Sequence, residues 1–103
     1  MYYTYMIRCT DNSIYTGITT DLERRMNEHI SKNDKCAKYT LQHNVKKFEL
    51  AWESETRMLS SKLEYWIKKM TKKQKESLIK DPTLFNKLLS NNIVCEKYKL
   101  VNI

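Results

Sequence analysis

Hydrophobic and polar positions alternate along two segments near the N-terminus. Residues 2–9 are rich in β-branched and aromatic side chains, which predicts a strand. Asp11-Asn12 is typical of a turn, so residues 13–18 are expected to form the return strand of a hairpin. A third short strand is predicted over residues 48–53. The pattern therefore indicates a small sheet of three strands.

Helical periodicity replaces this alternation elsewhere. Apolar positions three and four residues apart predict a helix over about 21–30, with Leu22, Met26 and Ile30 facing the core, and a longer helix over 57–70. Two stretches have the spacing of capping boxes, Thr20 to Glu23 before the first helix and Thr71 to Gln74 before another that runs to Lys80.

The predicted element order is β-β-α-β-α-α, which is an α+β fold with a three-stranded sheet flanked by helices. Because a helix links the second strand to the third, those two strands need not be neighbours in the sheet. Residues 1–80 are expected to form the domain. Residues 81–103 are expected to be a helical and extended C-terminal extension of it.

Composition narrows the class of protein. A chain of 103 residues has room for one domain, and no apolar run approaches the roughly 20 residues of a membrane span. The N-terminus resembles a strand rather than a signal peptide. Cys9, Cys36 and Cys95 are odd in number and widely spaced, which favours free thiols in a cytoplasmic protein.

A net charge of +7, from 19 Lys and Arg against 12 Asp and Glu, favours a polyanionic partner such as nucleic acid. Biased codon usage would give the same excess. A run of lysines from the end of the long helix onward is either a track for a nucleic-acid backbone or a solvated helical face; its members are Lys68, Lys69, Lys72, Lys73 and Lys75.

The first helix carries the most suggestive basic side chains. Arg25 and His29 lie one turn apart on the flank of its apolar stripe, whereas Arg24 points nearly opposite. The planar guanidinium of Arg25 suits a phosphate. The alternative is an ordinary ion pair with Glu28 and a structural role for His29.

Two tyrosines and one glutamate complete the candidate set. Tyr5 and Tyr15 emerge on the same face of the hairpin if its loop has an odd number of residues, and on opposite faces after a two-residue turn. Cross-strand packing of the two rings is the simpler interpretation. Glu64 lies off the apolar stripe of the long helix, and a solvent-facing ion pair with Lys68 explains it equally well.

Three separated blocks of this sequence together resemble the GIY-YIG nuclease superfamily, in its single-domain bacterial (YhbQ-like) branch. The blocks are Tyr3-Thr4-Tyr5 before Tyr15-Thr16-Gly17, then Arg25 and His29 on a helix, then Glu64 on a later one. The resemblance covers about residues 2–80. It implies a three-stranded antiparallel sheet flanked by helices, which agrees with the predicted element order. It also implies metal-dependent hydrolysis of phosphodiester bonds, usually in DNA.

Carried over by this resemblance, the catalytic residues are Tyr5, Tyr15, Arg25, His29 and Glu64, with Glu64 as the ligand of one Mg²⁺ or Mn²⁺ ion. A hard cation on one carboxylate keeps most of its waters. Either tyrosine, or His29, remains open as the general base. The residues expected to bind substrate are Lys38, Tyr39 and Lys72.

The motif departs from the family in having Tyr3 and Thr4 for the usual glycine and isoleucine. The expected partner is DNA, recognised by structure or with low sequence specificity, and RNA is not excluded. A DNA-binding module with little catalysis, acting with a partner protein, is the alternative function. The sequence does not indicate an oligomeric state.

Overall fold

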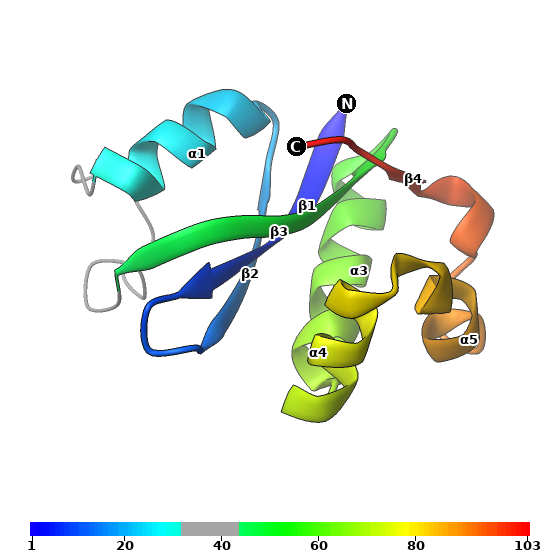
Figure 1. Cartoon of the computed structure of the whole chain (residues 1–103). Coiled ribbons are helices and arrows are strands. Elements are labelled where there is room, and N and C mark those ends of the chain that lie inside the picture. Colours follow the sequence, from blue (N-terminus) through cyan, green and yellow to red (C-terminus); the bar gives the residue numbers. More distant parts are fainter. Residues whose placement is uncertain (32–43) are drawn as a thin grey trace.

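The structure of the chain is a computed structural model, which describes residues 1–31 and 44–103 (Figure 1). Its helices and strands, in chain order, are β1 (Tyr2–Cys9), β2 (Ile14–Thr19), α1 (Leu22–Ser31), β3 (Val45–Ser54), α3 (Arg57–Lys69), α4 (Lys72–Lys80), a 3₁₀ turn (Pro82–Leu84), α5 (Phe85–Leu89), a second 3₁₀ turn (Cys95–Lys97) and β4 (Lys99–Leu100). The described part is thus α+β, as the sequence predicts.

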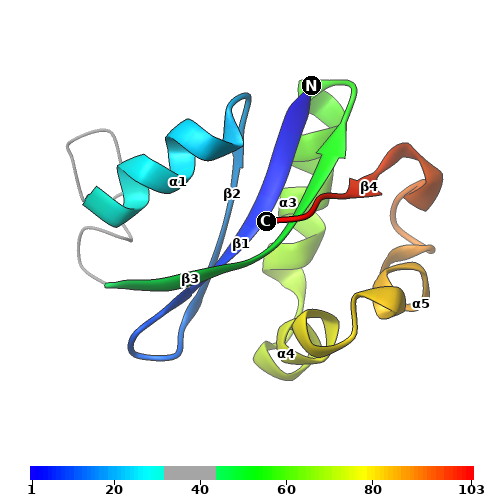
Figure 2. The same cartoon turned by 45° about the horizontal axis from the view of Figure 1, so that its top comes forward.

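The strands form one antiparallel sheet in the order β2-β1-β3-β4. Four strands are present rather than the expected three, because the two-residue β4 pairs with Trp52 and Glu53 of β3. The connection from β2 through α1 to β3 passes over β1, so those strands are not neighbours. In consequence β2 is an edge strand, at the opposite edge from β4 (Figure 2).

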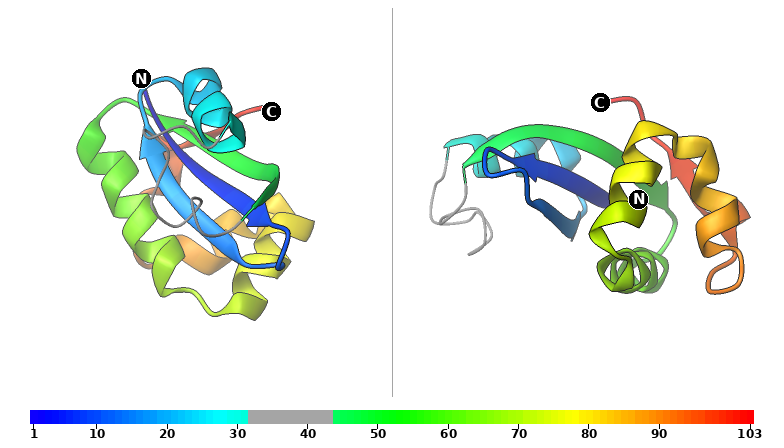
Figure 3. Two further views of the ribbon diagram at one scale, coloured as in Figure 1. Left: turned by 90° about the vertical axis from the view of Figure 1, so that its left-hand side faces the viewer. Right: turned by 60° about the horizontal axis from the view of Figure 1, so that its bottom comes forward.

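Alternation along β1 sends successive side chains into two different cores. Met6 joins a cluster with residues of α3, α4 and α5, whereas Tyr5 and Ile7 face the other side of the sheet, where α1 packs. The axis of α3 runs beside the edge strand β2 (Figure 3). Side chains on one face of α3 can therefore reach past β2 to the side of the sheet that α1 covers.

Helix α1 differs in two details from the sequence prediction. Its N-terminal cap is Asp21, whose Oδ1 accepts a hydrogen bond of 3.1 Å from the Arg24 amide, so the predicted cap at Thr20 is wrong. Ile30 is 64% exposed, whereas His29 is fully buried. A step of seven residues from Leu22 returns to nearly the same side of a helix of 3.6 residues per turn, and a step of eight overshoots it.

The two helices after β3 begin where the sequence predicts them. Thr56 caps α3 by accepting from the Leu59 amide at 3.2 Å. The predicted capping box of Thr71 and Gln74 is present at the start of α4. Beyond α4, Phe85, with Leu89 and Ile93, packs into the core cluster that contains Trp52 of β3. The segment after residue 80 therefore packs against the sheet and forms part of its core.

Candidate active site

The hydroxyl of Tyr5 lies at the centre of a polar cluster beneath α1. It is 2.9 Å from Nε2 of His29, and it accepts a hydrogen bond of 3.2 Å from Nε of Arg25. Tyr5 is only 1% exposed and His29 is fully buried. This geometry is compatible with a structural role for His29 as a hydrogen-bonded core histidine. It is equally compatible with a role in proton transfer.

Tyr15 enters the same cluster from the neighbouring strand. Tyr5 pairs with Gly17 and Ile7 pairs with Tyr15, so the two tyrosines project from the same face of the sheet. Their ring centroids are 6.4 Å apart, and the Tyr15 ring is 5.9 Å from that of His29. The hairpin loop thus has the parity that brings both phenols together.

Gly17 explains how Tyr5 fits into this space. A Cβ atom placed on Gly17 would lie 2.5 Å from the Tyr5 hydroxyl and 2.7 Å from its Cζ. The ring of Tyr5 therefore lies across the backbone of β2, which no other residue type permits without a shift. Gly17 lies inside β2, which continues to Thr19.

Arg25 forms the ion pair considered for it and also contacts the tyrosine cluster. Its Nη1 forms an ion pair of 2.9 Å with Glu28, while its Nε donates to Tyr5. Arg24 is exposed on another side of the helix. The ion pair orients the guanidinium, so that Arg25 presents positive charge to the Tyr5 hydroxyl.

Glu64 approaches the cluster from α3. Its side chain is 24% exposed and forms the expected i, i+4 ion pair with Lys68, at 3.4 Å. Lys68 in turn places its ammonium 5.8 Å from the centroid of the Tyr15 ring. Burial is the main cause of the raised pKa of Tyr15; Arg25 opposes it, and the Glu64 carboxylate adds to it. Glu64 is thus close enough to act electrostatically on the phenols.

Protonation in the cluster is set by burial. Burial raises the pKa of Tyr5 to about 12, although its hydrogen bond from Arg25 opposes the rise. Burial, followed by the charge of Arg25, lowers the pKa of His29 to about 4. At neutral pH the cluster therefore holds a phenol and a neutral imidazole that share one short hydrogen bond, whose direction depends on the imidazole tautomer.

Of the three residues predicted to bind substrate, only Lys72 lies among the described residues, and it contacts the hairpin turn rather than this cluster. Lys38 and Tyr39 lie outside the described residues. Lys72 donates to the carbonyl of Asn12 in the hairpin turn and forms an ion pair with Glu76 at 3.1 Å. Lys68, which the sequence predicts as a partner of Glu64 and as a member of the lysine run, lies beside the ring of Tyr15.

The described side chains of this site could bind a divalent metal only through a single carboxylate. Among residues 1–31 and 44–103, no group of three or more His, Cys, Asp or Glu side chains is placed to hold a metal. Among the described residues, Glu64 offers a partly exposed carboxylate beside the phenols, whereas Glu28 is paired with Arg25. A single carboxylate suits Mg²⁺ or Mn²⁺, which retain most of their water ligands, and does not suit a cage-binding ion such as zinc.

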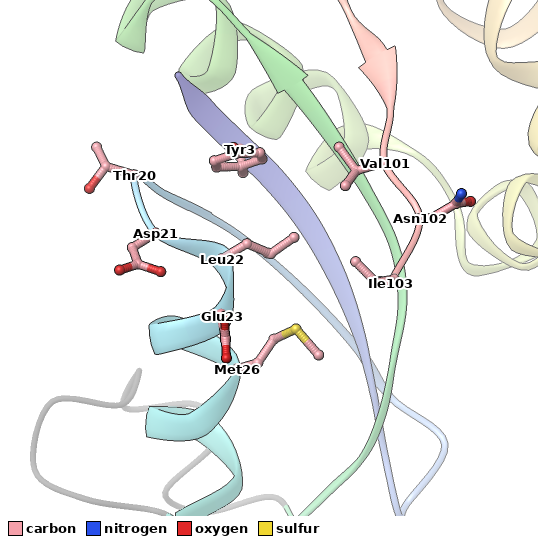
Figure 4. A pocket seen from close by; sticks show the side chains of 9 residues that line it. All are labelled: Tyr3, Thr20, Asp21, Leu22, Glu23, Met26, Val101, Asn102 and Ile103. Atoms are coloured by element: carbon pink, nitrogen blue, oxygen red, sulfur yellow. The ribbon is translucent and has the colours of Figure 1, made fainter.

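A different cavity, of about 450 Å³, lies between α1 and the C-terminal residues. Figure 4 shows Leu22 and Met26 on one side of it and Val101 and Ile103 on the other. Asp21 and Glu23 also line it, so its charge is unsuited to a phosphate. None of the residues in the tyrosine cluster lines this cavity, so we do not assign the active site to it.

Within residues 1–31 and 44–103, none of the helices has both the length and the apolar character of a membrane-spanning helix.

Comparison with known proteins agrees with this arrangement. The GIY-YIG catalytic domain family matches residues 1–77. The chain is 46% identical over 90 residues to the UPF0213 protein FN1575 of Fusobacterium nucleatum, covering 87% of this chain and 88% of that one. It is 40% identical, with the same coverage, to the UPF0213 protein YhbQ of Salmonella arizonae.

A solved structure adds to this comparison. The solution NMR structure of the UPF0213 protein BH0048 from Bacillus halodurans is 34% identical, with a TM-score of 0.50. The match covers 78% of this chain and 84% of that one. The chain belongs to the GIY-YIG family, a family of nuclease domains, and within it resembles the UPF0213 proteins of bacteria.

Proposed function

We propose that the protein is a metal-dependent endonuclease that hydrolyses phosphodiester bonds in DNA, with recognition by structure or with low sequence specificity. The observation that carries the proposal is the meeting of Tyr5, Arg25 and His29 under α1 with the Glu64 carboxylate at the neighbouring edge. A net charge of +7 supports a polyanionic substrate.

The side chains divide the work as follows. Arg25, held by Glu28, neutralises negative charge that develops on the phosphate. The Tyr5 hydroxyl and Nε2 of His29 already share a hydrogen bond, so this pair accepts the proton that the attacking water must lose. Glu64 would hold one Mg²⁺ or Mn²⁺, which when bound polarises the phosphate and stabilises the leaving oxygen. Arg25 and Tyr5 can act only if the scissile phosphate lies beside them.

One observation favours a second function. The raised pKa of Tyr5, to about 12, opposes formation of a phenolate, and Lys68 already occupies one oxygen of Glu64. A nucleic-acid-binding domain with little catalysis, acting with a partner, would have the same fold and charge. The hydrogen bonds that join the Tyr5 hydroxyl to His29 and to Arg25 favour proton transfer beside a positive charge, so we prefer the nuclease.

A cleavage assay separates the two functions. End-labelled duplex, flap, branched and single-stranded DNA, and RNA of the same sequences, are incubated with the purified protein and Mg²⁺ or Mn²⁺. Cleavage of at least one DNA that stops on addition of a chelator supports the nuclease. Retarded migration of these nucleic acids without cleavage under either metal supports the binding module, and cleavage of RNA alone would change the substrate class.

A further inference from the structure

A second cavity, of about 290 Å³, opens beside the candidate active site. It is separate from the acidic cavity of Figure 4 and shares Arg25 and Glu28 with the tyrosine cluster. The other lining side chains that matter here come from β1, β2 and the first turns of two helices: Tyr2, Thr19, Arg24 and Arg57. Arg25 therefore links this cavity directly to the Tyr5 hydroxyl.

The cavity contains positive charge that the protein does not neutralise. The chain has four arginines, and Arg8 and Arg25 both form ion pairs with carboxylates. Arg24 and Arg57 have no carboxylate within ion-pair distance among the described residues, and both line this cavity. Within the described part of the chain, the two guanidiniums without a carboxylate partner thus line the same cavity.

Folding stability does not account for these positions. Arg57 is the first residue of α3, and no acidic residue lies in the first turn of that helix. Arg24 lies in the first turn of α1. Cations near a helix N-terminus are unfavourable, because the N-terminus itself carries partial positive charge. Two guanidiniums that line one cavity without a carboxylate partner among the described residues favour an anion there.

We propose that this cavity binds a second phosphate of the nucleic-acid strand whose scissile phosphate lies at Arg25 and Glu64, and that Tyr2 stacks on the adjoining base. The proposal rests on the proposed function, since it places the rest of the substrate strand. Arg57 is seven residues before Glu64 on α3, or about 10 Å along the helix axis. The strand therefore runs along α3 and the edge strand β2, from the site towards the N-terminus of α3.

Stacking on Tyr2 defines the class of substrate. An aromatic side chain can receive a base only where that base is not paired and stacked within a duplex. The preferred substrate is therefore DNA with a single-stranded segment on this side of the cleaved bond, such as a flap, an overhang or a single strand.

Binding measurements test the proposal without relying on cleavage. Fluorescence anisotropy of a labelled single strand is followed against salt concentration, with chelator and in a Glu64→Gln background. Arg24→Gln and Arg57→Gln should each weaken binding by about fivefold to tenfold and reduce the salt slope by about 0.7. Tyr2→Leu should weaken binding of the single strand but not of a blunt duplex of equal length.

Lys99→Gln is the matched control, since it removes one charge at the opposite edge of the sheet, in β4. It should leave the affinity and the salt slope within twofold of the background. If Arg24→Gln and Arg57→Gln behave as Lys99→Gln does, or if the background protein does not bind the single strand, the proposal is wrong. If the wild type never cleaves DNA but the arginine variants still weaken binding, the nuclease proposal fails and this binding site remains.

Discussion

The hydroxyl of Tyr5 lies 2.9 Å from Nε2 of His29, in a place closed to solvent. Neither side chain gains a charge easily there, because burial raises the pKa of Tyr5 and lowers that of His29. Arg25 supplies the only charge that contacts the Tyr5 hydroxyl directly within the described residues. At neutral pH the two side chains are therefore uncharged and share one hydrogen bond.

The lowered pKa of His29 predicts a loss of stability in mild acid. The unfolded chain binds a proton below about pH 6.5, and the folded chain binds it only near pH 4. The free energy of unfolding should therefore fall as the pH decreases from 6.5 to 4, by up to about 3 kcal/mol. Urea unfolding at a series of pH values measures this fall. His29→Gln should flatten the curve within that window, and an unchanged slope would contradict the assigned protonation.

A second charged cluster predicts acid sensitivity at lower pH. Arg8 forms ion pairs with Glu49 at 2.6 Å and with Glu76 at 2.5 Å, which join β1 to β3 and α4. The hydrogen bond from Arg8 is the main reason that the pKa of Glu76 falls to about 2. This contribution to stability is complete above about pH 4.5 and is lost as the pH falls to 2.

Glu76→Gln should thus cost about 1 kcal/mol at pH 7, after allowance for solvent screening, and nothing near pH 2. Arg8→Met should cost about 3 kcal/mol at pH 7, because it leaves Glu49 buried without its guanidinium. Urea unfolding of both variants at pH 7 and pH 2 provides the comparison. If both variants lose the same free energy of unfolding at pH 7, the ion pair between Arg8 and Glu49 does not contribute to stability.

Much of this structure follows from signals that are local in the sequence. Strand alternation and the Thr71–Gln74 capping box predict their elements correctly, because each depends on neighbouring residues. The two-residue β4 was missed as a fourth strand, because its pairing with Trp52 depends on a distant segment. The buried side of α1 was missed by one residue, since periodicity alone did not distinguish His29 from Ile30.

The site was predictable only in part for the same reason. Periodicity does not select Glu64 over Glu55; the resemblance did, and its placement depends on α3 lying beside β2. The cavity requires Arg24 and Arg57, 33 residues apart in the sequence and in the first turns of two helices, to meet at one edge of the sheet. No pattern within either helix indicates that meeting.

The contact between Gly17 and Tyr5 predicts a pair of opposite effects at adjacent positions. Gly17→Ala should displace the Tyr5 ring, destabilise the protein by about 1–3 kcal/mol and reduce cleavage. Thr16, on the other face of β2, has a buried Oγ1 without a hydrogen-bond partner in the described structure. Thr16→Val should therefore leave cleavage unchanged and stabilise by about 1 kcal/mol. Thermal unfolding and the cleavage rate distinguish the two, and a stable, active Gly17→Ala variant would contradict the account.

The packing of Phe85 predicts that the C-terminal segment is needed for folding. Its ring centroid lies 5.1 Å from that of Trp52, and the side chain is 8% exposed. Phe85→Ala should reduce the free energy of unfolding by about 3 kcal/mol or more. Leu100→Ala, at a side chain 46% exposed, is the control and should cost less than about 1 kcal/mol. Similar losses in urea unfolding would contradict the burial of Phe85.

The most direct test of the proposed nuclease is the cleavage rate of Glu64→Gln, which removes the carboxylate proposed to hold the metal beside the phenols. Glu96→Gln, at an exposed position near β4, is the matched control. With Mg²⁺ and a single-stranded or flap DNA, Glu64→Gln should cleave about 100-fold or more slowly than the wild type, while its DNA affinity and the rate of Glu96→Gln stay unchanged. Cleavage by Glu64→Gln at the wild-type rate would contradict the account.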